Sequence, residues 1–133
     1  MDTRWLKEDD YETTLTEWWS DWKFASPLKA NLPDNGLGGL MVSNNGINIC
    51  AGFLYQTNSK TAWIEFVVSN KKYRENNRGQ ALELLINVLS IKASELGYTH
   101  IYTSLTHPVL MKRYEQCGFI AASKGCTEMI KVL

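Results

Sequence analysis

The sequence predicts an α+β fold of the α/β/α type, in which a mixed sheet of six or seven strands lies between flanking helices. The first observation is a β-rich segment, residues 39–68, whose three strands are joined by short turns and are therefore antiparallel. The second is a long apolar helix expected over residues 80–96, followed by a strand over residues 98–105. A strand, a crossover helix and a strand form a parallel pair, so both orientations occur in one sheet.

Length and composition indicate one globular domain over residues 1–133. The 14 basic and 14 acidic residues balance, which argues against a nucleic-acid or membrane partner held by a basic surface. The 3 cysteines lack metal-ligand spacing and suggest a reducing compartment without a metal site. The charged start of the chain and the lack of a long apolar run favour a cytoplasmic protein.

The first expected elements are a strand at Arg4–Leu6 and a helix that Asp9 caps, with Glu12 bonding back to the cap. Large residues then follow at helical spacing on one face: Tyr11, Leu15, Trp18 and Trp22. We interpret these aromatics, with the adjacent Trp19, as core; the alternative is that one or two of them line a substrate mouth. Prolines and the Asp34-Asn35-Gly36 run make residues 26–36 a loop or a broken helix.

The antiparallel strands are expected over residues 39–43, 47–56 and 61–68, and Asn44-Asn45-Gly46 supplies the first hairpin turn. Alternation of side chains divides the third strand between two faces. One face carries Trp63, Glu65 and Val67, and the other carries Ile64, Phe66 and Val68.

After the central helix, Gly97 suits the helix C-terminus because glycine accepts the left-handed conformation. Pro108 fits the first turn of a further helix, which ends at Gly118. Residues 119–122 and 127–132 are expected as the last two strands.

The junction between the third strand and the central helix predicts an anion site. A charged and amide-rich loop leads from the strand to Gly79, where the helix begins. The first N–H groups of a helix lack internal partners and carry the positive end of its dipole, which suits a phosphate or pyrophosphate.

Two segments can be compared with known motifs. Residues 76–81 read NNRGQA, and residues 107–119 read HPVLMKRYEQCGF, with Tyr114, Gly118 and Phe119 as the matching positions. With the order of elements from Gly38 onward, these segments resemble the GNAT superfamily of acyl-CoA-dependent N-acyltransferases. Asn76 departs from that family's arginine or glutamine, and His107 replaces its asparagine.

The resemblance implies a site for acetyl-CoA as co-substrate. Val67, Val68 and Ser69 would pair with the pantetheine arm through their backbone. The pyrophosphate would meet the start of the central helix, with Arg74 and Arg78 as charged donors. The residues implied there are Arg74, Asn76, Arg78, Gly79, Gln80 and Ala81.

Two alignments of the loop stay open. Without gaps, the family's strand end falls on Ser69-Asn70-Lys71 and its glutamate general base falls on Glu65. If the strand ends at Val67-Val68, the loop is longer than usual and Arg74 takes the missing arginine's role. We prefer the longer loop, because Val67 and Val68 have the character of buried strand residues and Asn70-Lys71-Lys72 do not.

The implied reaction is direct acetyl transfer to an amine in a ternary complex. Tyr114 would donate a hydrogen bond to the leaving thiolate, and Glu65 would accept the proton of the amine, through water or with a pKa raised by burial. The ordinary alternatives are a core tyrosine packed on Phe119 and an exposed strand glutamate. For His107 we expect a cap or a surface position.

We therefore expect an N-acetyltransferase, a monomer or homodimer, whose acceptor is a small-molecule or peptide amine. The alternative is a GNAT-like module that binds CoA or another protein and has weakened catalysis. Asn76 and the irregular loop favour that alternative.

Overall fold

The computed structural model describes residues 1–133. Its five strands are β1 (Asp2–Trp5), β2 (Gly39–Asn44), β3 (Ile47–Tyr55), β4 (Thr61–Ser69) and β5 (His100–Tyr102). Its α-helices are α1 (Thr16–Asp21), α2 (Arg78–Glu95) and α3 (Pro108–Gln116). A π-helical turn, η1 (Tyr11–Leu15), precedes α1, and two 3-10 turns, η2 (Lys29–Asn31) and η3 (Pro33–Gly36), follow it.

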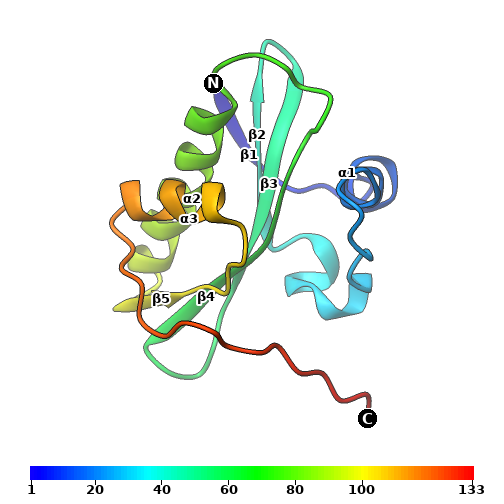
Figure 1. Cartoon of the computed structure of the whole chain (residues 1–133). Helices are drawn as coiled ribbons and strands as arrows, with labels where there is room; N and C mark the ends of the chain where they lie inside the picture. The colour runs from blue at the N-terminus through cyan, green and yellow to red at the C-terminus, as the bar shows by residue number, and fades with distance from the viewer.

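The strands form one mixed sheet in chain order, β1-β2-β3-β4-β5. The neighbours from β1 to β4 are antiparallel, and β4 and β5 are parallel across the α2 crossover. Helices α2 and α3 lie on one side of the sheet, and α1 with the 3-10 turns lies on the other (Figure 1). The mixed α+β architecture is therefore confirmed.

The predicted strand count of six or seven is wrong, because the sheet has five strands. Residues 119–122 and 127–132 form no strand, and nearly every residue beyond Phe119 is exposed. Their composition favours β structure, but a strand also needs the backbone of a neighbour. In this chain the segment pairs with nothing.

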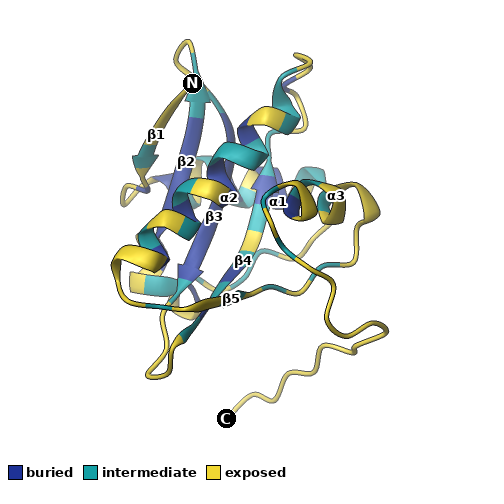
Figure 2. Ribbon diagram, turned by 90° about the vertical axis from the view of Figure 1, so that its left-hand side faces the viewer, coloured by how far each residue is buried: buried dark blue, intermediate teal, exposed yellow.

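The sheet separates two hydrophobic clusters. The cluster under α2 contains the buried face of that helix, which includes Ala81, Leu85, Ile86 and Leu89. Figure 2 shows this buried stripe of α2 directed at the sheet. The opposite cluster contains Leu15, Trp18 and Trp19, so the core interpretation of this aromatic helix is confirmed for these residues.

The start of the aromatic helix differs from the prediction. Asp10 stands at its N-cap, and no side chain caps the helix. The Asp10 carboxylate instead accepts hydrogen bonds from the Arg4 guanidinium at 2.7 and 3.0 Å. Glu12 pairs with Lys29 at 3.1 Å, so the expected capping box of Asp9 and Glu12 does not form.

A β-bulge in β4 overturns the predicted alternation of its side chains. Ala51 pairs with Val68 and Phe53 with Glu65, so Gly52 alone faces two residues of β4. The extra residue shifts the alternation by one, so side chains after the bulge point to the opposite face from the predicted one. Ile64 belongs to the cluster under α2, whereas Val68 belongs to the opposite cluster.

Candidate functional site

The open edge of β4 is the main feature of the site. Thr61–Trp63 pair with His100–Tyr102, but β4 continues to Ser69 after β5 has ended. A gap therefore opens between β4 and the chain that follows β5. Only its start is bridged, where Thr103 Oγ1 donates to the Ile64 carbonyl at 2.6 Å. Beyond Glu65, no strand pairs with β4 on this side. Its outward-facing backbone groups can therefore bind a ligand, apart from the Ser69 carbonyl, which already accepts a hydrogen bond from Trp22.

The end of β4 differs from the strand end preferred from the sequence. The strand ends at Ser69, and the Asn70 N–H still donates to the Ile49 carbonyl at 2.7 Å. The preferred strand end at Val67-Val68 is therefore wrong. Asn70 has the composition of a loop residue, yet its side chain also extends the pairing by donating to the Asn48 carbonyl at 3.1 Å.

The bulge gives the middle of β4 an unusual backbone. Phe66 has a φ of 56°, in the left-handed region that a non-glycine residue seldom adopts. The side chain of Phe66 is exposed and its ring lies 6.3 Å from that of Tyr55. Gly52 permits the close approach, since a Cβ there would lie 2.8 Å from Val67 Cγ2. Strain of this kind is concentrated at functional sites.

Glu65 lies immediately before the bulge, at the mouth of the gap. Its carboxylate accepts a hydrogen bond from the Ser104 N–H at 2.8 Å. Burial raises the pKa of Glu65 to about 6, and the nearby Glu128 carboxylate adds to the rise. Glu65 is thus a half-buried carboxylate with a pKa near neutrality, unlike the exposed glutamate of the ordinary interpretation.

Tyr114 reaches the gap from α3. The residue is 1% exposed, and its ring packs edge-on against Phe119 with centroids 5.0 Å apart. Its hydroxyl is buried and makes no hydrogen bond of ordinary geometry. The Thr103 hydroxyl beside it, which donates to the Ile64 carbonyl, partly offsets the effect of burial on the pKa of Tyr114. Burial raises the pKa of Tyr114 above its ordinary value, so the phenol stays protonated and remains a donor.

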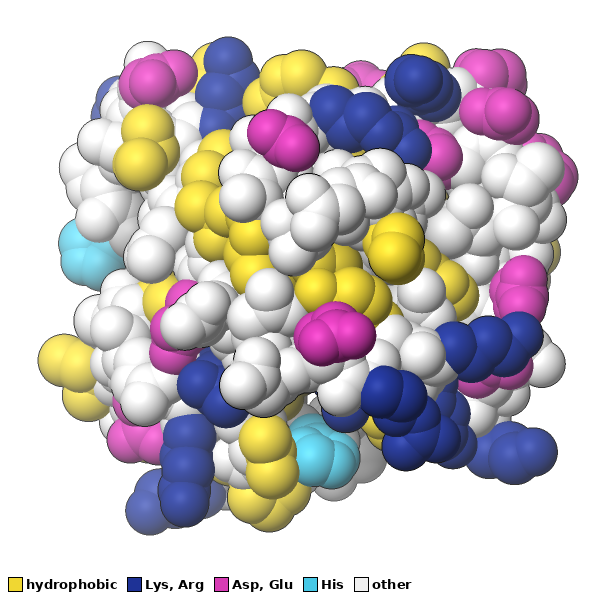
Figure 3. Space-filling view, turned by 90° about the horizontal axis from the view of Figure 1, so that it is seen from above, with side chains coloured by type: hydrophobic (Ala, Val, Ile, Leu, Met, Phe, Trp, Pro, Cys, Tyr) yellow, Lys and Arg dark blue, Asp and Glu magenta, His cyan; other side chains and the backbone are white.

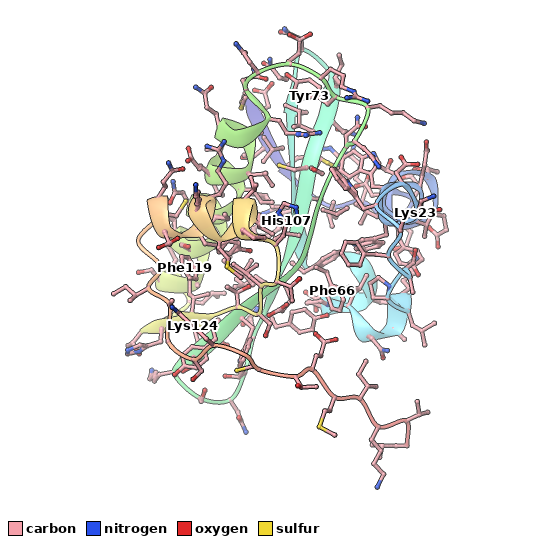
Figure 4. The ribbon with its side chains drawn as sticks, viewed as in Figure 1. Lys23, Phe66, Tyr73, His107, Phe119 and Lys124 are labelled. Carbon is pink, nitrogen blue, oxygen red and sulfur yellow. The ribbon has the colours of Figure 1, made fainter.

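The loop from β4 to α2 is held by its own polar groups. The Asn70 side chain accepts a hydrogen bond from the Lys72 N–H at 3.1 Å, and Tyr73 is buried with its hydroxyl bonded to Asn77 at 2.7 Å (Figure 4). The Arg78 guanidinium lies 3.5 and 3.4 Å from the carbonyls of Asn70 and Tyr73. Residues 74–76 are exposed, so Arg74 and Asn76 face solvent.

The N-terminus of α2 offers three of the four predicted N–H groups. No side chain caps the helix, and Arg78, Gly79 and Gln80 precede the first internal hydrogen bond. Ala81 is a correction, because it is buried and its N–H already donates to the Asn77 carbonyl at 3.1 Å.

Arg113 is a residue of the site that the sequence argument missed. Its guanidinium covers Gly79, where an added Cβ would collide with Arg113 Cζ. Gly79 therefore makes room for a cation from α3 rather than for a ligand alone. Arg113 also lies 3.4 Å from the Glu83 carboxylate. The only signal in the sequence was Gly79 at the helix start. A glycine there indicates that another group approaches the backbone closely, but it does not identify that group.

Trp22 joins α1 to the end of the open edge. Its Nε1–H donates to the Ser69 carbonyl at 2.8 Å. Lys71 Nζ lies 5.0 Å and Arg78 Cζ 5.8 Å from the centroid of its ring, within the range of cation–π contacts. The alternative that an aromatic of this helix lines a substrate mouth thus stays a prediction, with Trp22 as the residue that contacts the open edge.

The surroundings of the site carry mixed charge. Figure 3 shows the end of the molecule that holds the loop from β4 to α2, with basic and acidic side chains interspersed around hydrophobic ones. His107 is exposed at the N-cap of α3 and makes no side-chain cap hydrogen bond. Two surface hollows of about 350 and 410 Å³ lie elsewhere, beside Lys60 and beside Pro33. Neither hollow is lined by residues 64–69 of the open edge.

Three further findings describe the whole chain. No three histidine, cysteine, aspartate or glutamate side chains are grouped so that they could hold a metal ion. None of the helices combines the length and apolarity that crossing a membrane requires. All three cysteines are free.

Comparisons with known proteins connect this fold to acetyltransferases. No protein-family model matches the chain, and no curated protein sequence matches it significantly. N-acetylglutamate synthase from Neisseria gonorrhoeae, solved with coenzyme A and L-arginine, superposes with a TM-score of 0.74 at 13% identity. That match covers 96% of this chain and 29% of the synthase.

Two smaller proteins match over almost their full length. Glucosamine-6-phosphate N-acetyltransferase from Arabidopsis thaliana has a TM-score of 0.68 at 12% identity, with 98% of both chains covered. An acetyltransferase from Trypanosoma brucei has a TM-score of 0.63 at 19% identity, with 97% of this chain and 99% of that chain covered. At these identities the likeness concerns architecture. This chain therefore has the fold of the GNAT acetyltransferases.

Proposed function

We propose that this chain is an acyl-CoA-dependent N-acyltransferase that transfers an acetyl group directly from acetyl-CoA to an amine. The observation that carries the proposal is the buried Tyr114 hydroxyl, which has no partner beside the open edge of β4. Leaving such a group unpaired costs about 1–3 kcal/mol. A ligand that completes its hydrogen bonding explains why the cost is tolerated.

The residues around the gap fit an acyl-CoA. Val67, Val68 and Ser69 would bond the pantetheine arm through the backbone of the open edge. The N–H groups of Arg78, Gly79 and Gln80 would meet the pyrophosphate. Asn76 replaces a longer donor and is exposed, so the loop diverges from the family pattern. Arg113 and Arg78 would supply the positive charge instead.

Glu65 would act as general base for the amine. An alkyl ammonium with a pKa near 10.4 must lose its proton before it attacks, which costs about 4–5 kcal/mol at pH 7. A carboxylate with a pKa of about 6 accepts that proton better than an ordinary glutamate does. In the transfer, the neutral amine nitrogen bonds to the acetyl carbon and the carbon–sulfur bond breaks. Of the two protons that the ammonium loses, one leaves to solvent and the other, taken up by Glu65, ends on the thiol of CoA.

Tyr114 would stabilise the leaving thiolate. The raised pKa of the phenol makes full proton transfer to sulfur less favourable, so the expected role is a hydrogen bond that strengthens as charge develops. The amide product and the free thiol then leave together with no covalent enzyme intermediate.

The test follows thiol release from acetyl-CoA with a broad panel of amines. Tyr114→Phe keeps the ring packed on Phe119, so we expect a normal fold, unchanged acetyl-CoA affinity and at least a tenfold lower kcat, or about 1.4 kcal/mol. Tyr98→Phe is the matched control, because its hydroxyl bonds Thr57 at the opposite end of β4. An unchanged kcat in the Tyr114 variant removes Tyr114 from the mechanism.

The same panel separates the enzyme from its rival. A chain that binds acetyl-CoA and acetylates none of the amines would behave as the catalytically weakened module. Thiol release that depends on an amine, with the acetyl group recovered on that amine, supports the enzyme.

A further inference from the structure

Phe66 presents an exposed aromatic ring next to the proposed base. It follows Glu65 directly in β4, and its side chain is 42% exposed. Its φ of 56° is costly for a residue with a β-carbon. Such residues persist where the surrounding structure holds them, and they cluster at ligand sites. Neither burial nor backbone preference therefore explains the position of this ring.

Tyr55 links the ring of Phe66 to the segment that follows α1. The two ring centroids are 6.3 Å apart, and the Tyr55 hydroxyl donates to the Asn31 carbonyl in η2 at 2.8 Å. Burial, together with the nearby Glu65 carboxylate, raises the pKa of Tyr55 to about 12. Figure 4 shows Phe66 on the side of β4 that faces α1 and the 3-10 turns. Two aromatic rings and the Glu65 carboxylate therefore lie together at this entrance to the open edge.

The segment between α1 and η2 adds apolar surface on the same side of the sheet. Phe24 and Leu28 are 65 and 68% exposed. The Tyr11 hydroxyl donates to the Pro27 carbonyl at 2.7 Å, which fixes the segment to the aromatic cluster of α1. This side of the molecule therefore offers apolar surface to a ligand whose polar group meets a carboxylate.

The charge at this entrance is negative. Glu65 takes part in none of the ion pairs of the chain. The other charged group that acts on it is the Glu128 carboxylate, which adds to the rise of its pKa. Lys71 and Arg78 lie beside Trp22, at the other end of the open edge. An ammonium group would be attracted to this entrance, whereas a carboxylate or phosphate would find no cation there.

We propose that the acceptor is a primary amine on an aromatic or aliphatic body that carries no anionic group. Its amino group would approach Glu65, and its apolar body would pack on the exposed face of Phe66. This inference rests on the proposed acyltransferase function and names the acceptor of that reaction. Amino acids and sugar phosphates would be poor acceptors, because binding would strip water from their anionic group without pairing it.

The first test compares 2-phenylethylamine, ethanolamine and phenylalanine in the thiol-release assay with acetyl-CoA. We expect kcat/KM for 2-phenylethylamine to exceed both other values at least tenfold. In Phe66→Asn it should fall at least tenfold for 2-phenylethylamine and stay within twofold for ethanolamine. Asparagine accepts a positive φ, so this variant keeps the backbone of the bulge. Ile91→Asn is the matched control, because Ile91 is 58% exposed on α2, on the opposite side of the sheet, and should change neither value (Figure 1).

The second test measures binding without catalysis, by calorimetric titration of the same compounds into the chain saturated with CoA. We expect 2-phenylethylamine to bind at least tenfold more tightly than phenylalanine, and at least fivefold more weakly to Phe66→Asn than to wild type. Equal rates for the three amines, no binding of 2-phenylethylamine, or binding that Phe66→Asn leaves unchanged would overturn this inference. Transfer to polar amines in that case would leave the acyltransferase in place. Binding as expected with no acetyl transfer to any amine would instead overturn the proposed function and keep the amine site.

Discussion

At the residue scale, two titratable groups, one half-buried and one fully buried, approach the gap between β4 and β5 from different elements. Glu65 comes from β4 and holds a carboxylate whose pKa is raised to about 6. Tyr114 comes from α3 and holds a phenol whose pKa is also raised, so it remains a donor. Burial therefore gives one group the character of a base near neutral pH and keeps the other protonated.

The pKa of Glu65 predicts the pH dependence of the reaction. Below pH 6 both the amine and Glu65 must lose a proton, so log(kcat/KM) should rise with a slope of about 2. Above pH 6 only the amine limits the rate, and the slope should fall to about 1. Initial rates between pH 5 and 8 measure this break. In Glu65→Gln the slope should stay near 1 throughout, and a break that persists there would assign it to another group.

The raised pKa of Glu65 also predicts how stability depends on pH. As the pH rises, this carboxyl lowers the free energy of unfolding, whereas most carboxyls raise it. The folded pKa of about 6 lies above the ordinary value, so ionising Glu65 opposes folding. Its contribution is favourable below about pH 4.5 and is lost as the pH rises through 6. Urea unfolding at pH 4.5 and pH 7 should therefore show Glu65→Gln gaining stability relative to wild type at pH 7. An equal difference at both pH values contradicts the shift.

At the element scale, β4 carries the site because of its bulge and its length. The bulge at Phe66 exposes that residue and leaves Glu65 at the mouth, while the strand continues beyond the end of β5. The sequence predicts a strand here, and a regular strand places its side chains alternately on the two faces of the sheet. Gly52 was the missed signal, since an isolated glycine within a strand often marks a bulge in the neighbouring strand.

Gly52→Ala tests the role of the bulge. The new Cβ would lie 2.8 Å from Val67 Cγ2 and 3.3 Å from Leu85 Cδ2, so we expect a loss of about 1–3 kcal/mol in unfolding free energy. Acetyl-CoA affinity should fall as well, because Val67 belongs to the open edge. Val67→Ala in the same chain removes the closest contact and should restore part of both. No change on Gly52→Ala would mean that the bulge tolerates a side chain.

Elements with a strong local signal were predicted well. The central helix, the hairpin turn at Asn45-Gly46 and the helix that starts at Pro108 depend on periodicity and turn chemistry within a few residues. The contacts that build the site join distant segments, such as Arg113 with Gly79 and Trp22 with Ser69. Local patterns contain no information on such pairs, and the strands expected after Gly118 failed for the same reason, since pairing is not a local property.

At the scale of the whole molecule, the open end of the sheet is where its two layers meet. Trp22 from the α1 side bonds the end of β4, and its ring lies beside Arg78 at the start of α2. Arg113 brings α3 to the same helix terminus. The proposed acyl-CoA would therefore contact elements from both layers and should stabilise the molecule as a unit.

The most direct test of this account is the melting temperature of the purified chain with and without acetyl-CoA. A ligand that binds only the folded state at 100 times its dissociation constant stabilises it by about 2.7 kcal/mol, which corresponds to a rise of several degrees. We expect that rise with acetyl-CoA and a smaller one in Arg113→Gln, which lacks one cation at the α2 terminus. No rise for the wild-type chain at millimolar acetyl-CoA would contradict the acyl-CoA site.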